Sequence, residues 1–323
     1  MRDFILEIRK LYELKSIDDT VKVNGRLQSL AEKNYTSILL ADYFLSHKKV
    51  ENDEKIFDIL IIENVQKIVS DETYETFYET YGDVIGDFFP GQVEELEENK
   101  TKHAKIVNAI LQTQESIEKQ NYKKASETAK KAGFSIEEKK LKKVCEVFEK
   151  TKKTYRQASQ QKRKESVAEH IYSSLLFAKI ILENTEYELN KSKTYKIILH
   201  HDNPEIIVGD TNIIEITDDN WLDIRRKEFK GQIKVQKLLP TSYGYHTTHY
   251  YKEYHDLASE EADFSKAIQS LDAEIHEMNY DEDWENYTEQ KLRERKDELF
   301  EEYPLLQDIY EETIKYQKEK GNL

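Results

Sequence analysis

The sequence predicts an all-α protein built from two tandem helical domains, the first a degenerate copy of the second. Two compositional observations and one repeat favour this fold class. The chain has 323 residues, of which 38% are hydrophobic, with only nine glycines and four prolines. Enough apolar residues for a core, together with few turn formers, favours long helices over a β-rich fold.

The third observation is an internal repeat. Residues 29–45 (SLAEKNYTSILLADYFL) and 166–182 (SVAEHIYSSLLFAKIIL) are identical at eight of 17 positions without a gap. Three further pairs of blocks occur in the same order: 11–19 with 147–155, 55–73 with 193–211, and 103–112 with 261–270. Chance similarity between amphipathic helices explains one such pair, but four in one order indicate a tandem duplication. We therefore predict domains over residues 1–125 and 130–323.

Hydrophobic periodicity predicts the main elements of the second copy. An apolar stripe at helical spacing comprises Ile171, Leu175, Ala178 and Leu182. A second helix is expected over 194–207. The basic stretch 136–164 is interpreted as an entry helix followed by an exposed loop, with a solvated helix face favoured over an anion-binding patch. Residues 280–321 are expected to form an acidic, tyrosine-rich pair of helices broken near Pro304.

Charge and cysteine content exclude several classes of protein. The net charge of −15 makes the general phosphate term of nucleic-acid binding repulsive. The single cysteine, Cys145, forms no intrachain disulfide framework and is interpreted as a packed helix residue. Because the chain lacks an 18-residue apolar run and its N-terminus lacks a signal-peptide core, we expect a cytoplasmic protein without a membrane partner.

The second copy carries chelating side chains where the first copy does not. The corresponding positions are Lys33 with His170, Ile62-Glu63 with His201-Asp202, Gln66 with Glu205, and Ser70-Asp71 with Gly209-Asp210. His201 and Glu205 are four residues apart, which predicts one face of a helix, and His170 belongs to a separate helix. Two imidazoles and a carboxylate suit a divalent ion such as Mn²⁺, Co²⁺, Fe²⁺ or Zn²⁺.

Such an ion lowers the pKa of a bound water and polarises a phosphoryl oxygen. Glu205 and Asp210 are then available to transfer a proton to the leaving oxygen or to orient the water. Arg163, seven residues before His170, is able to hold a phosphate by paired hydrogen bonds. The whole pattern, R-x-E-S-V-A-E-H followed by H-D-x-x-E-x-x-x-G-D, predicts a metal-dependent phosphohydrolase site.

These two segments, RKESVAEH at 163–170 and HDNPEIIVGD at 201–210, closely resemble HD-domain proteins of the bacterial 5′-deoxynucleotidase type. The stretches 227–239 and 251–275 also look like later parts of that family. The resemblance covers roughly residues 140–278, under half of the chain.

The resemblance implies an all-helical HD fold and hydrolysis of a nucleoside 5′-monophosphate to nucleoside and phosphate. It implies metal ligands at His170, His201 and Asp202. Glu205 and Asp210 would then be catalytic or substrate-binding, and Arg163 or Arg156 would contact the phosphate.

One position departs from the family pattern. The final metal ligand of the family is an aspartate, and the matching residue here is Gln269. An amide oxygen is neutral and binds these ions less well than a carboxylate, so metal affinity should be lower. Asp272 lies one turn further, about 4.5 Å along the helix axis, and is not expected to replace it. The first copy has Leu111 at the matching place.

Two functions stay open on these grounds. We favour an enzyme, a metal-dependent phosphomonoesterase acting on a nucleotide. The alternative is a catalytically impaired binding or assembly protein on a duplicated HD scaffold, which Gln269 and the degenerate first copy favour. Regulators of cyclic-dinucleotide or guanosine tetraphosphate signalling carry other motifs, which are not found here. A homodimer and a pseudo-dimer of the two copies are both compatible with the sequence.

The aromatic run at 242–255 (SYGYHTTHYYKEYH) is interpreted first as packing at a helix start. A base-stacking pocket for the nucleotide is the second interpretation. His246, His249 and His255 lie within this run, but no spacing singles them out as metal ligands.

Overall fold

The computed structural model describes residues 1–65, 96, 98–211, 216–217, 219–285 and 287–323. Gln66, Ser70 and Asp71, the predicted counterparts of Glu205 and of Gly209-Asp210, lie outside the described residues. The described residues are mainly helical and include two small antiparallel sheets, which confirms the all-α fold class.

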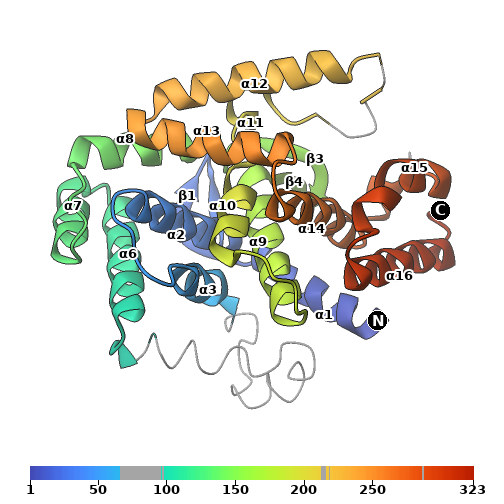
Figure 1. Ribbon diagram of the computed structural model, residues 1–323, viewed down its shortest axis with the longest axis horizontal. Coiled ribbons are helices and arrows are strands. Elements are labelled where there is room, and N and C mark those ends of the chain that lie inside the picture. The colour runs from blue at the N-terminus through green and yellow to red at the C-terminus, as the bar shows by residue number, and fades with distance from the viewer. Residues whose placement is uncertain (66–95, 97, 212–215, 218, 286) are drawn as a thin grey trace.

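The first half of the chain contributes helices around one β-hairpin. Its elements are α1 (Arg2–Leu11), η1 (Tyr12–Lys15), β1 (Asp18–Val23), β2 (Arg26–Ser29), α2 (Leu30–Leu45), α3 (Glu54–Ile62), α6 (Lys102–Glu118) and α7 (Tyr122–Lys131). Helices α6 and α7 lie at one end of the molecule, as Figure 1 shows.

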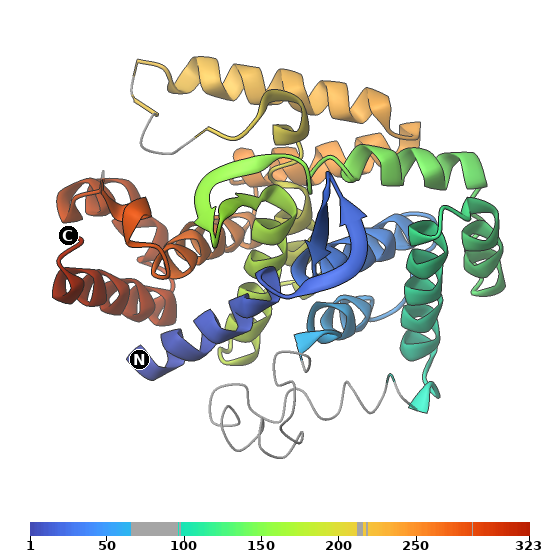
Figure 2. The same ribbon diagram turned by 180° about the vertical axis from the view of Figure 1, so that it is seen from behind.

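The second half repeats a helix, a hairpin and a long helix before it extends further. Its elements are α8 (Glu138–Phe148), β3 (Tyr155–Gln160), β4 (Arg163–Ser166), α9 (Val167–Glu183), α10 (Lys191–His200), α11 (Glu205–Val208), α12 (Trp221–Leu238), α13 (Thr241–His255), α14 (Glu260–Glu277), η5 (Asp281–Trp284), α15 (Glu289–Phe300) and α16 (Pro304–Lys320). The break between α15 and α16 at Pro304 agrees with the sequence. Helices α15 and α16 lie near both chain termini, at the opposite end from α7 (Figures 1 and 2).

The hairpins correct one expectation. Residues 155–166, expected to be part of an exposed loop, form β3 and β4, joined by Gln161 and Lys162. In the first half Asn24 and Gly25 join β1 and β2, and both have positive φ. Two-residue loops of this kind turn antiparallel strands tightly, and Asn-Gly is a strong signal for them.

A second correction concerns the helix expected over 194–207. Helix α10 ends at His200, and the short α11 begins at Glu205 after Pro204. Proline lacks an N–H group, and its ring clashes with the carbonyl four residues before it. His201 and Glu205 therefore do not share one face of a continuous helix.

The two halves meet where α2 and α9 begin. Ser29 and Ser166 are the N-caps of these helices, and Glu32 and Glu169 complete a capping box in each. The Ser29 hydroxyl donates to Glu169 Oε1 at 2.7 Å, and the Ser166 hydroxyl donates to Glu32 Oε1 at 2.8 Å. Each buried carboxylate thus serves the first turn of its own helix and a hydroxyl of the other half.

Two arginines complete this reciprocal arrangement. Arg26 donates to both oxygens of Glu32, and Arg163 donates to both oxygens of Glu169. Each arginine also reaches a backbone carbonyl of the other half, that of Lys152 for Arg26 and that of Lys15 for Arg163. The equivalent residues are 137 positions apart, as in the sequence repeat. This supports a duplication, which stays a prediction.

One continuous hydrophobic core includes residues of both halves, from Ile5 to Ile314. The predicted boundary between residues 125 and 130 lies inside helix α7. The halves therefore share a core instead of each enclosing its own. Among the described residues, no helix is both long enough and apolar enough to cross a membrane.

We expect Ser29→Ala to lower the free energy of unfolding by about 2 kcal/mol. About 1 kcal/mol comes from the lost cap, and about 1 kcal/mol comes from the buried hydrogen bond to Glu169. Thr288→Ala is the matched control, because Thr288 caps the exposed start of α15 and bonds only within its own turn. Chemical denaturation measures both variants, and equal losses would contradict a contribution from the contact between the halves.

Candidate metal centre

Three of the predicted metal ligands come together at the end of α10. His170 is in the first turns of α9, and His201 and Asp202 follow α10. His201 Nε2 lies 3.1 Å from Asp202 Oδ2, and His170 Nε2 lies 3.7 Å from the same oxygen. One ligand atom from each of the three residues lies within 4.8 Å of the others. This spacing allows one ion to contact all three.

The two imidazoles present unpaired nitrogens to this point. Within the described part of the chain, the buried Nε2 atoms of His170 and His201 have no hydrogen-bond partner. The outer nitrogen of His201, Nδ1, lies 2.6 Å from the Ile198 carbonyl oxygen, so Nδ1 carries the proton and Nε2 carries a lone pair. Buried polar atoms without partners are costly, and a divalent ion would satisfy both. The donor set therefore fits a transition metal.

Asp272 holds the other imidazole. Its Oδ2 lies 3.1 Å from His170 Nδ1 and accepts hydrogen bonds from the hydroxyls of Ser173 and Ser174. Its Oδ1 accepts a hydrogen bond from the Tyr12 hydroxyl. A carboxylate on the outer nitrogen of a ligating histidine fixes the ring orientation and makes the inner nitrogen more basic. On this geometry Asp272 would position His170 and would not itself act as a ligand.

Burial raises the pKa of the Asp272 carboxyl, but the hydrogen bond to His170 and the charge of Lys15 outweigh burial and lower it. Asp272 is therefore charged at neutral pH although it is fully buried.

Gln269, the predicted fourth ligand, is on α14 beside this centre. Its Oε1 accepts a hydrogen bond of 2.7 Å from the Tyr254 hydroxyl. The Tyr254 ring lies 5.0 Å from the His201 ring, measured between centroids. The amide oxygen thus already accepts a hydroxyl proton. A metal ion would have to compete with the Tyr254 hydroxyl for this oxygen.

The predicted catalytic carboxylates lie on the turn after the metal ligands. Glu205 Oε2 is buried and, among described residues, has no hydrogen-bond partner. Burial, and then the charges of Asp202 and Asp210, raise the pKa of Glu205 well above its usual range. Asp210 Oδ2 accepts a hydrogen bond from the Gln157 backbone at 2.9 Å, which ties this turn to β3. Glu205 therefore retains a proton where ordinary carboxyls have lost theirs.

The two predicted phosphate-binding arginines have different surroundings. Arg163 is held by Glu169 at the junction of the halves, as described above. Arg156, on β3, donates to Glu165 Oε2 at 3.0 Å. Burial lowers the pKa of Arg156, but Glu165, Asp210 and Asp202 outweigh burial and raise it. Of the two arginines, Arg156 is the one whose pKa is raised by the predicted metal ligand Asp202.

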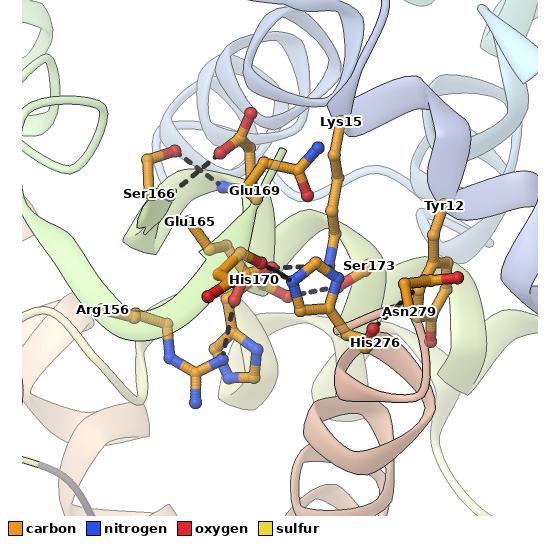
Figure 3. Close-up of polar contacts among 12 residues, drawn as sticks. Tyr12, Lys15, Arg156, Glu165, Ser166, Glu169, His170, Ser173, His276 and Asn279 are labelled. Carbon is orange, nitrogen blue, oxygen red and sulfur yellow. Dashed lines mark hydrogen bonds and ion pairs between the residues drawn. The ribbon is translucent and has the colours of Figure 1, made fainter. Parts of the chain in front are cut away.

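A buried network behind the centre was not found from the sequence (Figure 3). Lys15, from the first half, contacts Glu165 Oε1 at 2.5 Å and lies 3.3 Å from His276 Nδ1. Burial raises the pKa of Glu165, but His276, Lys15 and Arg156 together hold it well below its usual range. Lys15 and Tyr12 lie in a block marked only by its similarity to another helix, so neither residue was singled out.

Glu228 on α12 is a further carboxyl that sequence reasoning missed. Burial, followed by the charge of Asp202, raises the pKa of Glu228 to about 7. The aromatic run at 242–255 forms α13, in which Tyr243, Tyr251 and Tyr254 are buried. Packing therefore accounts for much of this run.

Comparison with known proteins matches residues 148–307 to the family described as the HD domain. The mouse (Mus musculus) protein 5′-deoxynucleotidase HDDC2 is 30% identical over 122 residues, which are 38% of this chain and 58% of that protein. The human (Homo sapiens) 5′-deoxynucleotidase HDDC2 is 28% identical over 120 residues, 37% of this chain and 56% of that protein. The chain thus matches little more than half of each relative's length.

One solved structure has a partial likeness to this chain. It is described as a predicted metal-dependent phosphohydrolase from Magnetospirillum magnetotacticum MS-1. The superposition has a TM-score of 0.46 at 21% identity and covers 57% of this chain and 93% of that one.

We expect Asp272→Asn to weaken Mn²⁺ binding by about 10–100-fold, the usual effect of losing a partner of a ligating histidine. Titration against a competing chelator measures the affinity, and circular dichroism checks the fold. Asp263→Asn, on the same helix but partly exposed, should bind Mn²⁺ like the parent protein. Unchanged affinity in Asp272→Asn would show that His170 is oriented without this carboxylate.

Gln269→Asp should raise the affinity for Mn²⁺, because it adds a negative charge and a better oxygen ligand. The same chelator titration tests this variant, and Gln269→Asn, which stays neutral, is its control. If Gln269→Asp binds Mn²⁺ no more tightly than the parent, the assignment of Gln269 to the fourth ligand position is wrong.

Proposed function

Residues 148–307 match the HD-domain family, and on that premise we propose that the chain hydrolyses a nucleoside 5′-monophosphate to a nucleoside and phosphate. The observation that carries this proposal is the pair of buried, unpaired Nε2 atoms of His170 and His201 beside the Asp202 carboxylate. His170, His201 and Asp202 would hold the divalent metal, as Mn²⁺, Co²⁺, Fe²⁺ or Zn²⁺. When bound, such an ion makes a coordinated water more acidic and polarises a phosphoryl oxygen.

The charge balance of the site explains why phosphate needs positive partners there. Asp202 and Asp210 are acidic, and both act on Arg156 together with Glu205. The charges of Asp202 and Asp210 would repel a phosphate dianion in a metal-free site. Arg156 adds a fixed positive charge with two-point hydrogen-bonding geometry, which suits a phosphate ester. We therefore assign phosphate binding to Arg156 and a structural role to Arg163.

Glu205 is suited to proton transfer. Hydrolysis forms a bond between the water oxygen and phosphorus and breaks the bond between phosphorus and the 5′ oxygen. The departing oxygen needs a proton, and a carboxyl with a raised pKa keeps its proton to a higher pH than an ordinary carboxyl does. Glu205 would supply this proton, while Asp210 fixes the turn against β3.

The substrate class is proposed from the relatives. Both matched proteins are named as 5′-deoxynucleotidases, and the HD-domain match over residues 148–307 includes His170, His201 and Asp202. A deoxynucleoside 5′-monophosphate is accordingly the first substrate to test.

Gln269 favours one alternative, a binding or assembly protein on a catalytically impaired HD scaffold. A neutral amide replaces one negative charge of the expected ligand set, so the site holds its metal less strongly. In that case the centre binds a nucleotide or a metal without turnover.

The test is phosphate release from a panel of ribo- and deoxynucleoside 5′-monophosphates with Mn²⁺ or Co²⁺. We expect activity in the parent protein and a loss of more than about 100-fold in Asp202→Ala, since removing a ligand costs more than removing a ligand's partner. His249→Ala, a change at a largely exposed side chain on α13, is the control and should retain full activity. No phosphate release, together with a bound-metal count that Asp202→Ala leaves unchanged, would reject the enzyme and leave the alternative.

A further inference from the structure

A second group of metal-binding side chains lies at the junction of the two halves. Asp42 comes from α2, His200 is the last residue of α10, and His246 is on α13. Asp42 Oδ2 lies 2.9 Å from His200 Nε2, and Asp42 Oδ1 lies 2.8 Å from His246 Nε2. Two imidazole nitrogens thus face the two oxygens of one carboxylate, and ligand atoms of all three residues lie within 4.8 Å of one another.

The group is built into the fold and is not a surface cluster. Asp42 and His200 are fully buried, while the His246 side chain is 22% exposed and leaves one side open to solvent. The Tyr243 hydroxyl donates to Asp42 Oδ2 at 2.8 Å. The Asp42 carboxylate thus lies between two imidazoles and a tyrosine hydroxyl.

Asn203 provides an independent indication of a ligand. Its amide nitrogen lies 3.1 Å from His200 Nδ1, while its amide oxygen is buried and has no hydrogen-bond partner among the described residues. Rotating the amide by half a turn places the oxygen against Nδ1, where it accepts a proton carried by Nδ1, and moves the amide nitrogen to the position that the oxygen held. His200 Nε2 then has a lone pair instead of a proton to share with Asp42. This is the usual state of a ligating histidine, whose outer N–H is held by an oxygen.

We propose that Asp42, His200 and His246 bind a second divalent transition metal of the Zn²⁺ type. Two imidazoles and one carboxylate are a frequent ligand set for Zn²⁺, which also takes a water as a fourth ligand. Ligand atoms around such an ion are separated by about 3.3 Å, from bonds of about 2.0–2.1 Å in a tetrahedral arrangement. Asp42 Oδ2 lies 2.9 Å from His200 Nε2 and 3.0 Å from His246 Nε2, and these two separations need to open by only a few tenths of an ångström.

This site would join the two halves of the chain. Asp42 belongs to the first half, whereas both histidines belong to the second. His200 and His201 are neighbours in sequence but face different carboxylates, Asp42 and Asp202. An ion held by Asp42 and His200 would fix the end of α10, from which the other centre takes two ligands. Binding to the folded state alone stabilises it by mass action.

Elemental analysis of the full chain, loaded with Zn²⁺ and passed through a desalting column, tests the proposal. We expect two ions per parent chain and one per His246→Ala chain. Asp42→Asn tests the same site from the first half. Asp202→Ala should also retain one ion, and His249→Ala, the matched control on α13, should retain two.

Thermal unfolding provides a readout that does not depend on activity. Zn²⁺ should raise the Tm of Asp202→Ala, in which only the second site is intact, and this increase should disappear in Asp202→Ala/His246→Ala. An ion count that is the same in the parent protein and in His246→Ala, together with no Zn²⁺-dependent rise in the Tm of Asp202→Ala, would overturn the proposal in favour of a metal-free hydrogen-bonded cluster. Failure of nucleotide hydrolysis has no effect on these ion counts, so the two proposals are tested separately.

Discussion

The contact between the first turns of α2 and α9 is the constraint on which the rest of the molecule depends. Glu169 caps its own helix, accepts the Ser29 hydroxyl and is held by Arg163. His170 is the next residue, so the capping geometry determines the position of its imidazole at the candidate metal centre. Because the carboxylates of Glu32 and Glu169 are buried and hydrogen-bonded across the junction, neither helix can shift without leaving a charge unpaired. The site is therefore positioned by the same contact that joins the halves.

The first half takes part in the chemistry of the second half indirectly. Tyr12 donates to Asp272, which holds His170, and Lys15 neutralises Glu165, which holds Arg156. Each series of contacts begins at a first-half side chain that does not bind a metal. It ends at a residue in or beside the candidate metal centre. This explains how a first half that contributes no side chain to the His170, His201 and Asp202 group can still retain specific polar residues inside a shared core.

Much of the fold and the centre could be predicted from sequence, and the remainder has identifiable physical reasons. His170, His201 and Asp202 were predicted from their characteristic spacing and from the lack of such residues at the matching positions of the first half, and the structure brings the three together. The hairpins were missed although Asn24-Gly25 is a strong turn signal, since the surrounding residues do not alternate clearly between apolar and polar. The break before Glu205 follows from Pro204 and was outweighed by the apolar run around it. Asp272, Lys15 and His246 act through contacts far apart in sequence, which no local spacing reveals.

The buried ion pair between Lys15 and Glu165 has a consequence for how the second half can exist. A fragment that begins after the first half would keep Glu165 and Asp272 but lose the ammonium and hydroxyl groups that accompany them. Removing one partner of a buried pair typically costs about 3–5 kcal/mol, a large part of the stability of a whole domain. In a protein assembled from separate chains, such a partner arrives only when the chains are concentrated enough to associate. Here the two halves belong to one chain. The first-half groups that support the candidate metal centre therefore stay in place at any protein concentration.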